Sequence, residues 1–145
     1  ELDFDFKKVT EKSKDNPVFY VQYAYARINS IFRILKINLK KKITFTDKEF
    51  SLNTHELQIL KKISEWPKCV ESSATKLEPH RIPFYLYELV TLFHSYWNLG
   101  NQNEEFRFIS NNNKLNKSKL VLLQSLAIVI ENGMKILGVS TPKKM

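Results

Sequence analysis

The helical spacing of its apolar residues is the feature of this chain that most constrains its fold. Between residues 17 and 35, apolar side chains recur three and four positions apart: Val18, Val21, Tyr25, Ile28, Phe32 and Leu35. Residues with this spacing share one face of an α-helix, which favours burial of that face. Because the chain holds only three glycines and five prolines, few residues interrupt such helices. The sequence therefore predicts a helical domain.

Local signals predict where the first helices begin and end. Asn16 and Pro17 are a capping residue and a first helical residue, so a long helix should open there. Asn53 should begin a second helix, which ends before Pro67 because the residue that precedes a proline disfavours the α region. Pro67 can then begin a short third helix. Residues 39–52 are expected to be a connector that is helical in part.

Two longer helices complete the predicted bundle. Residues 78–98 should form the fourth helix, with Gly100 as its terminator. The last helix should span about residues 118–137 and end at Gly138, and because it is apolar on two sides it should be the central buried helix. Between them, residues 101–117 are rich in Asn and Lys, which predicts a mobile loop. The predicted fold is all-α, an irregular bundle of about five helices.

Length, cysteine content and hydropathy limit the class of protein further. A chain of 145 residues fits one domain. Cys69 is the single cysteine, which excludes an internal disulfide and a cysteine-rich zinc site and favours a reducing compartment such as the cytoplasm. No stretch reaches the ~18 to 20 apolar residues needed to cross a bilayer, so no membrane segment is expected. Because Glu1 is not an initiator Met, we expect a piece of a longer protein.

A second stripe on the first helix points to recognition of unpaired bases. Tyr20, Tyr23 and Arg27 each lie two residues, or about 200°, beyond a residue of the apolar stripe, so they should face away from the core. Two phenol rings and a guanidinium on an outward face can stack on bases and pair with phosphates. The alternative is that the tyrosines pack under a neighbouring helix while Arg27 stays solvated.

Charge and a second aromatic cluster agree with a nucleic-acid partner without specifying one. The formal net charge is +8, which favours an anionic partner, although short lysine runs such as residues 40–42 are usually only solvated surface. His94, Tyr96 and Trp97 lie near the expected end of the fourth helix, where a flat side chain could receive a splayed base. Core packing is the alternative reading, above all for Tyr96.

Sites for catalysis are not evident in the sequence. The three histidines, His55, His80 and His94, fall on separate predicted helices without the spacing of zinc ligands. Three glycines provide neither a phosphate-binding glycine loop nor the sharp turn of a hydrolase nucleophile. We therefore expect no catalytic residue, metal or cofactor in this chain.

Several motifs, in order and spacing, closely resemble the C-terminal, DALR-type anticodon-binding domain of arginyl-tRNA synthetases. Residues 15–28 (DNPVFYVQYAYARI) resemble the signature that opens this domain. The likeness continues through THEL at 54–57, EPHR at 78–81, YLYEL at 85–89, FHSYW at 93–97, NGMKILGV at 132–139 and the terminal Met145. It covers almost the whole chain.

The resemblance implies a helical bundle that binds the anticodon loop and a separate catalytic domain that activates arginine with ATP and magnesium. Residues 1–15 would be the lead-in from that catalytic domain, and residues 16–145 the anticodon-binding domain. The expected partners are arginine tRNA and the catalytic domain of the same polypeptide, in a monomeric cytoplasmic parent, and the chain alone should be inactive. The residues implied to contact the anticodon loop are Tyr20, Tyr23, Arg27, Trp97 and Met145.

The resemblance has departures, and other functions remain open. Trp97 stands where the family commonly has Tyr, a conservative change for stacking, and residues 101–117 are longer than the usual connection, so contacts by this loop are not carried over. Cysteinyl-tRNA synthetases have related helical domains, but residues 22–24 (QYA) with Arg27, and the ending at Met145, favour the arginine enzyme. The alternative function is a helical protein-interaction module whose tyrosine stripe binds a partner helix.

Overall fold

Five α-helices and two short 3-10 turns make up the regular structure of the part that the computed structural model describes, residues 16–109 and 116–145. They are α2 (Pro17–Ile34), η1 (Asp47–Glu49), α3 (Thr54–Ser64), α4 (Trp66–Thr75), α5 (Arg81–Gln102), η2 (Glu104–Phe106) and α6 (Lys117–Ile136). These ranges contain no strand. The predicted all-α bundle is confirmed, whereas the expected lead-in, residues 1–15, lies outside the described residues.

Three of the five helices begin at an asparagine, because its side chain accepts hydrogen bonds from backbone N–H groups that the first turn leaves without partners. Asn16 Oδ1 accepts from the second and third residues of α2, at 3.1 and 3.2 Å. At α3 the cap is reciprocal: Asn53 Oδ1 accepts from the Glu56 N–H at 3.0 Å, and the Glu56 carboxylate accepts from the Asn53 N–H at 2.9 Å. Asn116 Oδ1 caps α6 by accepting from the Lys119 N–H at 3.2 Å.

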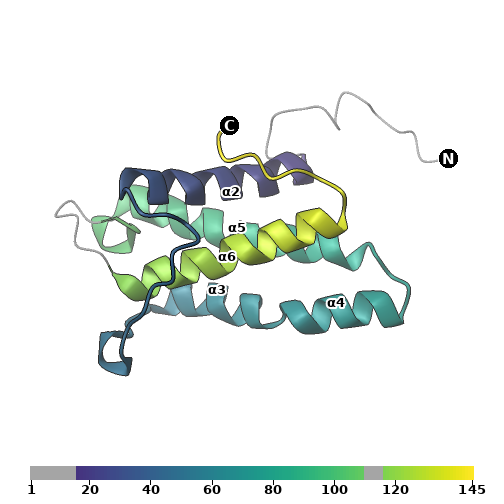
Figure 1. Ribbon diagram of the computed structural model, residues 1–145, viewed down its shortest axis with the longest axis horizontal. Helices are drawn as coiled ribbons and strands as arrows, with labels where there is room; N and C mark the ends of the chain where they lie inside the picture. Colours follow the sequence, from purple (N-terminus) through teal and green to yellow (C-terminus); the bar gives the residue numbers. More distant parts are fainter. Residues whose placement is uncertain (1–15, 110–115) are drawn as a thin grey trace.

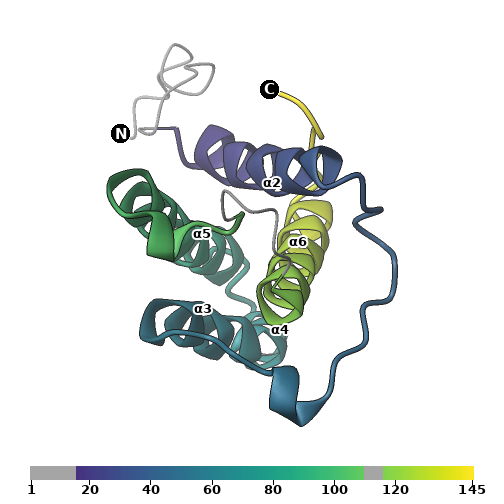
Figure 2. The ribbon, with the colours of Figure 1, turned by 90° about the vertical axis from the view of Figure 1, so that its left-hand side faces the viewer.

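α6 forms one side of the bundle and packs against α2, α3 and α5 (Figures 1 and 2). Its buried side chains meet those of α5, where Leu86, Leu89 and Phe93 are fully buried. The predicted burial of α6 is therefore confirmed, but its predicted central position is wrong, because α5 is the helix that packs against all the others. One side of α6 nevertheless faces outward, since Ile128 and Ile136 are more than half exposed.

Val18 of the predicted apolar stripe and Leu57 of α3 lie at the surface. Val18 is 42% exposed, because it lies ten residues before the buried Ile28 and so about 80° around the helix from it. Leu57 is also exposed, and the neighbouring position on α3 that turns inward carries Glu56, which is completely buried. Periodicity located the helices correctly but misjudged the edges of their buried arcs.

Gly100 does not end α5, contrary to the prediction. The helix continues to Gln102, and Gly100 is buried because the chain folds back over it. A Cβ at this position would lie 3.3 Å from both the Arg107 Cα and the Phe106 carbonyl oxygen, so this glycine permits a close approach of backbone. Gly138, by contrast, has φ of +69° and does terminate α6, as predicted.

The segment after α5 packs on the bundle. Phe106 and Phe108 meet the ring of Tyr96 edge to face, with centroids 6.2 and 5.0 Å apart. Phe108 also lies against Phe93. The prediction of a mobile loop is therefore wrong for residues 103–109, and residues 110–115 of that loop lie outside the described part of the chain.

Candidate nucleic-acid interface

The guanidinium of Arg27 lies between two aromatic rings that come from different helices. Its Cζ is 4.4 Å from the ring centroid of Tyr23, one turn earlier on α2, and 4.7 Å from that of Trp97 on α5. Arg27 Nη2 also donates a hydrogen bond to the Tyr23 hydroxyl at 2.9 Å. Cation–π contacts of this kind hold a guanidinium flat against the rings. Tyr23, Arg27 and Trp97 are each partly exposed, so the stack reaches the surface.

The row of rings continues along α2. The ring of Phe19 is nearly parallel to that of Tyr23, with an interplanar angle of 7° and centroids 6.1 Å apart. The imidazole of His94 on α5 stacks on the same tyrosine at 5.7 Å. Phe19, Tyr23, Arg27 and Trp97 thus form one continuous surface, which we call the aromatic row. The packing of α2 against α5 positions it, since three of its members are on α2 and Trp97 is on α5.

Tyr20 does not face away from the bundle as predicted. Its ring lies 4.3 Å from that of His94 and 5.5 Å from that of Tyr87, both on α5. Burial raises the pKa of the Tyr20 hydroxyl, and Tyr87 adds to the rise. The alternative of packing under a neighbouring helix therefore holds for Tyr20, because α2 is flanked by α5 as well as α6 and buries more than one stripe.

His94 supports the row from beneath and is uncharged at neutral pH. It is 4% exposed, and its Nε2 lies 3.2 Å from the carbonyl oxygen of Tyr20. Burial and, to a lesser extent, the charge of Arg27 lower the pKa of the imidazole to about 4, although the bond to Tyr20 opposes both. The cation of this surface is therefore Arg27.

Tyr96 belongs to the core and not to the aromatic row. Its hydroxyl donates to Glu56 Oε1 at 2.6 Å, and the same carboxylate oxygen pairs with Lys119 Nζ at 3.1 Å. This buried network joins α3, α5 and α6. The core reading of Tyr96 is thus confirmed. Nothing in the apolar spacing indicated the network, since the sequence places Glu56 in a first turn that is normally solvated.

Met145 lies at the end of a tail that runs over α2 in both views (Figures 1 and 2). The side-chain amide of Gln22 donates to the Ser140 carbonyl at 2.9 Å and so ties this tail to α2. Met145 itself is 52% exposed. Of the predicted site residues, the structure brings Tyr23, Arg27 and Trp97 together, packs Tyr20 behind them and leaves Met145 on the tail.

An apolar cavity of about 280 Å³ adjoins the row at Trp97. Its walls come from the end of α2, the end of α5 and the segment that follows α5: Ser30, Ile31, Ile34, Trp97, Gly100, Asn101, Phe106, Arg107, Phe108 and Ile109. The spacing of residues along the sequence did not indicate it, because the segment that closes it was predicted to be a loop. A cavity with aromatic walls beside an exposed ring can accept a planar group.

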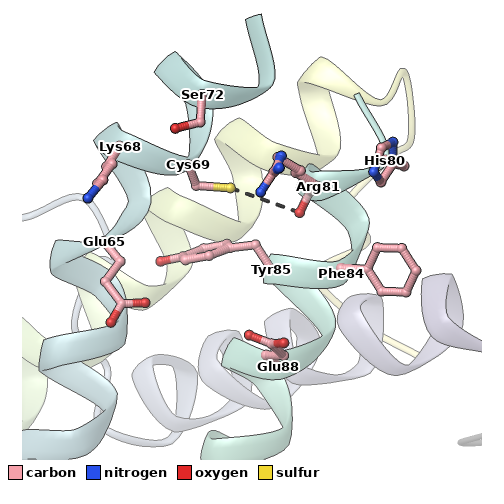
Figure 3. Close-up of a pocket in the computed structure, with 9 residues that line it drawn as sticks. All are labelled: Glu65, Lys68, Cys69, Ser72, His80, Arg81, Phe84, Tyr85 and Glu88. Atoms are coloured by element: carbon pink, nitrogen blue, oxygen red, sulfur yellow. Dashed lines mark hydrogen bonds between the residues drawn. The ribbon is translucent and has the colours of Figure 1, made fainter. Parts of the chain in front are cut away.

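A larger hollow of about 700 Å³ lies elsewhere, between α4 and the first half of α5 (Figure 3). Its lining is mainly polar and charged, and it includes the free Cys69, whose Sγ is 3.9 Å from the Arg81 carbonyl. Across residues 16–109 and 116–145, no group of His, Cys, Asp and Glu side chains is arranged to hold a metal ion. Within the same ranges, no helix is long and apolar enough to span a membrane.

Comparison with known protein families decides what kind of domain carries this surface. The family model described as the DALR anticodon binding domain matches residues 21–145. The chain belongs to this family. The matched range contains α3 to α6 in full and all of α2 except its first turn, so it includes Tyr23, Arg27 and Trp97. Phe19 and Tyr20 lie just before it.

Curated relatives of this DALR domain are named arginine–tRNA ligases. The protein from Pelagibacter ubique is 55% identical over 145 residues, which is all of this chain and 25% of the relative. That from Bartonella bacilliformis is 44% identical over 150 residues, covering 99% of this chain and 26% of the relative. The chain thus spans about a quarter of the length of these relatives.

Solved structures show the same fold for the DALR domain. The arginyl-tRNA synthetase of Thermus thermophilus superposes with a TM-score of 0.72, over 98% of this chain and 23% of that protein. A Campylobacter jejuni protein assigned as an arginyl-tRNA synthetase superposes with a TM-score of 0.78, over 98% of this chain and 29% of that protein. Both are 23% identical to this chain, so they support the fold alone.

Proposed function

We propose that this chain is the part of an arginine–tRNA ligase that binds the anticodon loop of arginine tRNA. The observation that carries the proposal is the Arg27 guanidinium held between Tyr23 and Trp97 at the surface of a DALR anticodon-binding domain. The names of the relatives support the choice of arginine tRNA.

Each residue of the surface has a role that follows from its contacts. The rings of Tyr23 and Trp97 stack on unpaired bases, a contact worth about 1 to 3 kcal/mol per base. Arg27 pairs with a phosphate or a base edge, and its planar fork is already oriented by the two rings. Tyr20 supports the row by packing between α2 and α5, and Met145 adds an apolar contact from the tail.

Catalysis in this proposal belongs to the rest of the ligase. The remaining three quarters of the protein bind ATP and magnesium and attach arginine to the tRNA, within a monomeric cytoplasmic enzyme. The 145-residue chain alone should therefore show no arginine-dependent exchange of pyrophosphate into ATP. Exchange above background would contradict this division of labour, and sedimentation of the whole ligase would test the monomer.

Binding of anticodon stem-loops tests the proposal directly. A hairpin with the arginine anticodon should bind more tightly than the same hairpin with altered anticodon bases, measured at several salt concentrations because phosphate contacts are salt-dependent. Tyr23→Ala should weaken the cognate complex by about tenfold or more, the value of one stacked base, and Arg27→Ala should also remove the preference between hairpins.

Arg33→Ala is the matched control for Arg27→Ala. Arg33 is exposed on the same helix and contacts no aromatic ring within the described residues. Its substitution therefore removes one charge and leaves the stack of Tyr23, Arg27 and Trp97 intact. It should lower the affinity for both hairpins by the same small factor. Equal affinity of the unsubstituted chain for the two hairpins would contradict anticodon recognition.

A further inference from the structure

The end of α6 is built to turn the chain back toward α2. Gly138, with φ of +69°, follows the last turn, and its N–H donates to the Lys135 carbonyl at 3.1 Å. The Val139 N–H donates to the Met134 carbonyl at 2.9 Å. This pair of bonds is a Schellman motif, which satisfies the last carbonyls of a helix and redirects the chain. The tail that leaves it runs over α2 in both views (Figures 1 and 2).

Side chains of α2 hold the redirected tail. Gln22 Nε2 donates to the Ser140 carbonyl at 2.9 Å, a bond between residues 118 positions apart. One turn further along α2, Tyr25 donates its hydroxyl to the Glu131 carboxylate of α6, and the Thr141 side chain opposes the rise in the pKa of this hydroxyl. The tail is therefore bonded to α2 at Ser140 and close to it at Thr141.

The position of Gln22 on α2 brings the start of the tail to the side of the helix next to Tyr23. Gln22 precedes Tyr23 and is therefore about 100° from it around the helix, on the side opposite α5. Ala26, one turn after Gln22, is only 7% exposed although it lies about 200° around the helix from the core residue Ala24. A small side chain at this point permits close packing over α2. Beyond the attachment, Lys143, Lys144 and Met145 are exposed.

We propose that Gln22 is a positioning residue for RNA binding: its amide holds the tail across α2, so that Lys143, Lys144 and Met145 border the aromatic row and contact the same RNA. This inference rests on the proposed function. Gln22 acts through the tail and does not itself touch the ligand. Because the amide is neutral and bonds to a backbone carbonyl, the attachment holds at any pH or salt concentration at which the bundle is folded.

Release of the tail is the first measurement. Gln22→Met keeps the length of the side chain and removes the donor, and Gln58→Met makes the same change at an exposed position of α3. Trypsin cleaves after lysine, so mass spectrometry should show cleavage after Lys143 and Lys144 accelerated by Gln22→Met, by between about twofold and tenfold, the equilibrium range for one hydrogen bond. Gln58→Met should leave the rate unchanged.

Coupling to the tail is the second measurement. Gln22→Met and removal of residues 143–145 should each weaken binding of the cognate hairpin, and the two changes together should weaken it no more than the removal alone. Thermal unfolding of each variant, followed by circular dichroism, separates this coupling from a loss of folded protein. A role of Gln22 in bundle stability alone predicts a lower melting temperature with additive effects on binding.

The outcomes divide the two proposals. Additive effects on binding, or unchanged tail cleavage in Gln22→Met, would overturn the positioning role. Anticodon binding would still be supported if Tyr23→Ala weakens the cognate complex. If neither Tyr23→Ala nor Arg27→Ala changes the affinity for the cognate hairpin, both anticodon binding and the positioning role are overturned.

Discussion

Arg27 is oriented before any ligand arrives, because the rings of Tyr23 and Trp97 already fix the plane of its guanidinium. A long cationic side chain normally loses rotamer freedom when it binds, which costs about 0.5 to 1.5 kcal/mol. In this bundle, folding has already restricted the rotamers of Arg27, so binding costs it little further rotamer freedom. The contact with Trp97 joins residues 70 positions apart, so it exists only once α2 and α5 are packed.

The stability of the bundle should depend on the protonation of His94. Burial holds the pKa of this imidazole near 4, against 6.5 for an ordinary histidine. Between these values the unfolded chain binds a proton that the folded chain does not, so the free energy of unfolding should fall as pH is lowered from 7 to 4. The expected loss is about 3 kcal/mol.

His94→Gln is the control, because it removes the titrating group while the carboxylates of the chain still titrate. Urea unfolding at a series of pH values should show the unsubstituted chain losing stability faster than the variant below about pH 6.5. Parallel curves for the two proteins would contradict the depressed pKa.

Gly133 of α6 faces Leu86 of α5 at close range. A Cβ on Gly133 would lie 2.8 Å from both terminal methyl groups of Leu86, which is fully buried, so the leucine would have to shift within the core. Gly133→Ala should therefore destabilise the bundle by about 1 to 2 kcal/mol. This net loss combines an overpacking cost of about 2 to 3 kcal/mol with the gain of ~1 kcal/mol in helix propensity.

Chemical unfolding of Gly133→Ala, of Leu86→Ala and of the double variant would measure this contact. Leu86→Ala vacates the space that the new methyl group needs, so the double variant should lose less stability than the sum of the single losses. A stabilising Gly133→Ala, as expected for an exposed helical glycine, would show that α5 and α6 tolerate the added group.

What the sequence predicted at the level of elements depended on whether the signal was local. Asparagine caps act within four residues, so the starts of α2 and α3 were predictable from Asn16 and Asn53. Gly100 was misread because the reason for a glycine there is the backbone of Arg107, seven residues away. The position of Tyr20 depended on which helix flanks α2, and no local pattern specifies a neighbour.

Prediction of the site followed the same division. The spacing of Tyr23 and Arg27 indicated a shared face. The aromatic cluster near the end of the fourth helix already included Trp97, and the family resemblance selected it for the same site. The stack of the three nevertheless depends on how α2 and α5 pack. The cavity beside Trp97 requires residues 103–109 to fold back on the bundle. The Asn- and Lys-rich composition of residues 101–117 predicted a loop instead, despite the small apolar island of Phe106, Phe108 and Ile109. The bond from Gln22 to Ser140 is likewise a tertiary contact.

At the scale of the molecule, the buried network around Glu56 connects three helices. Its carboxylate accepts from Tyr96 and the Asn53 N–H and pairs with Lys119, whose side chain is itself largely buried. Removing one member of a buried ion pair leaves the other charge without compensation. Glu56→Gln should therefore lower the free energy of unfolding by about 3 kcal/mol.

The pair of Lys62 and Glu65 provides the comparison, because the Glu65 side chain is half exposed. Glu65→Gln should change stability by less than about 1 kcal/mol, since Lys62 keeps its ion pair with Glu88. Adding Lys119→Met to Glu56→Gln should recover part of the lost stability in urea titrations. Equal effects of Glu56→Gln and Glu65→Gln would mean that the buried network contributes little to holding α3, α5 and α6 together.

The placement of Trp97 gives the chain an optical reporter of its own. The sequence contains two tryptophans, and Trp66 lies on α4, where it packs against Tyr85. Trp66→Phe would leave the emission of the indole that Arg27 covers. A base that stacks on this ring quenches its fluorescence, whereas a base that contacts only Lys143 or Lys144 of the tail does not. Occupancy of the surface could thus be followed in real time without attaching a dye.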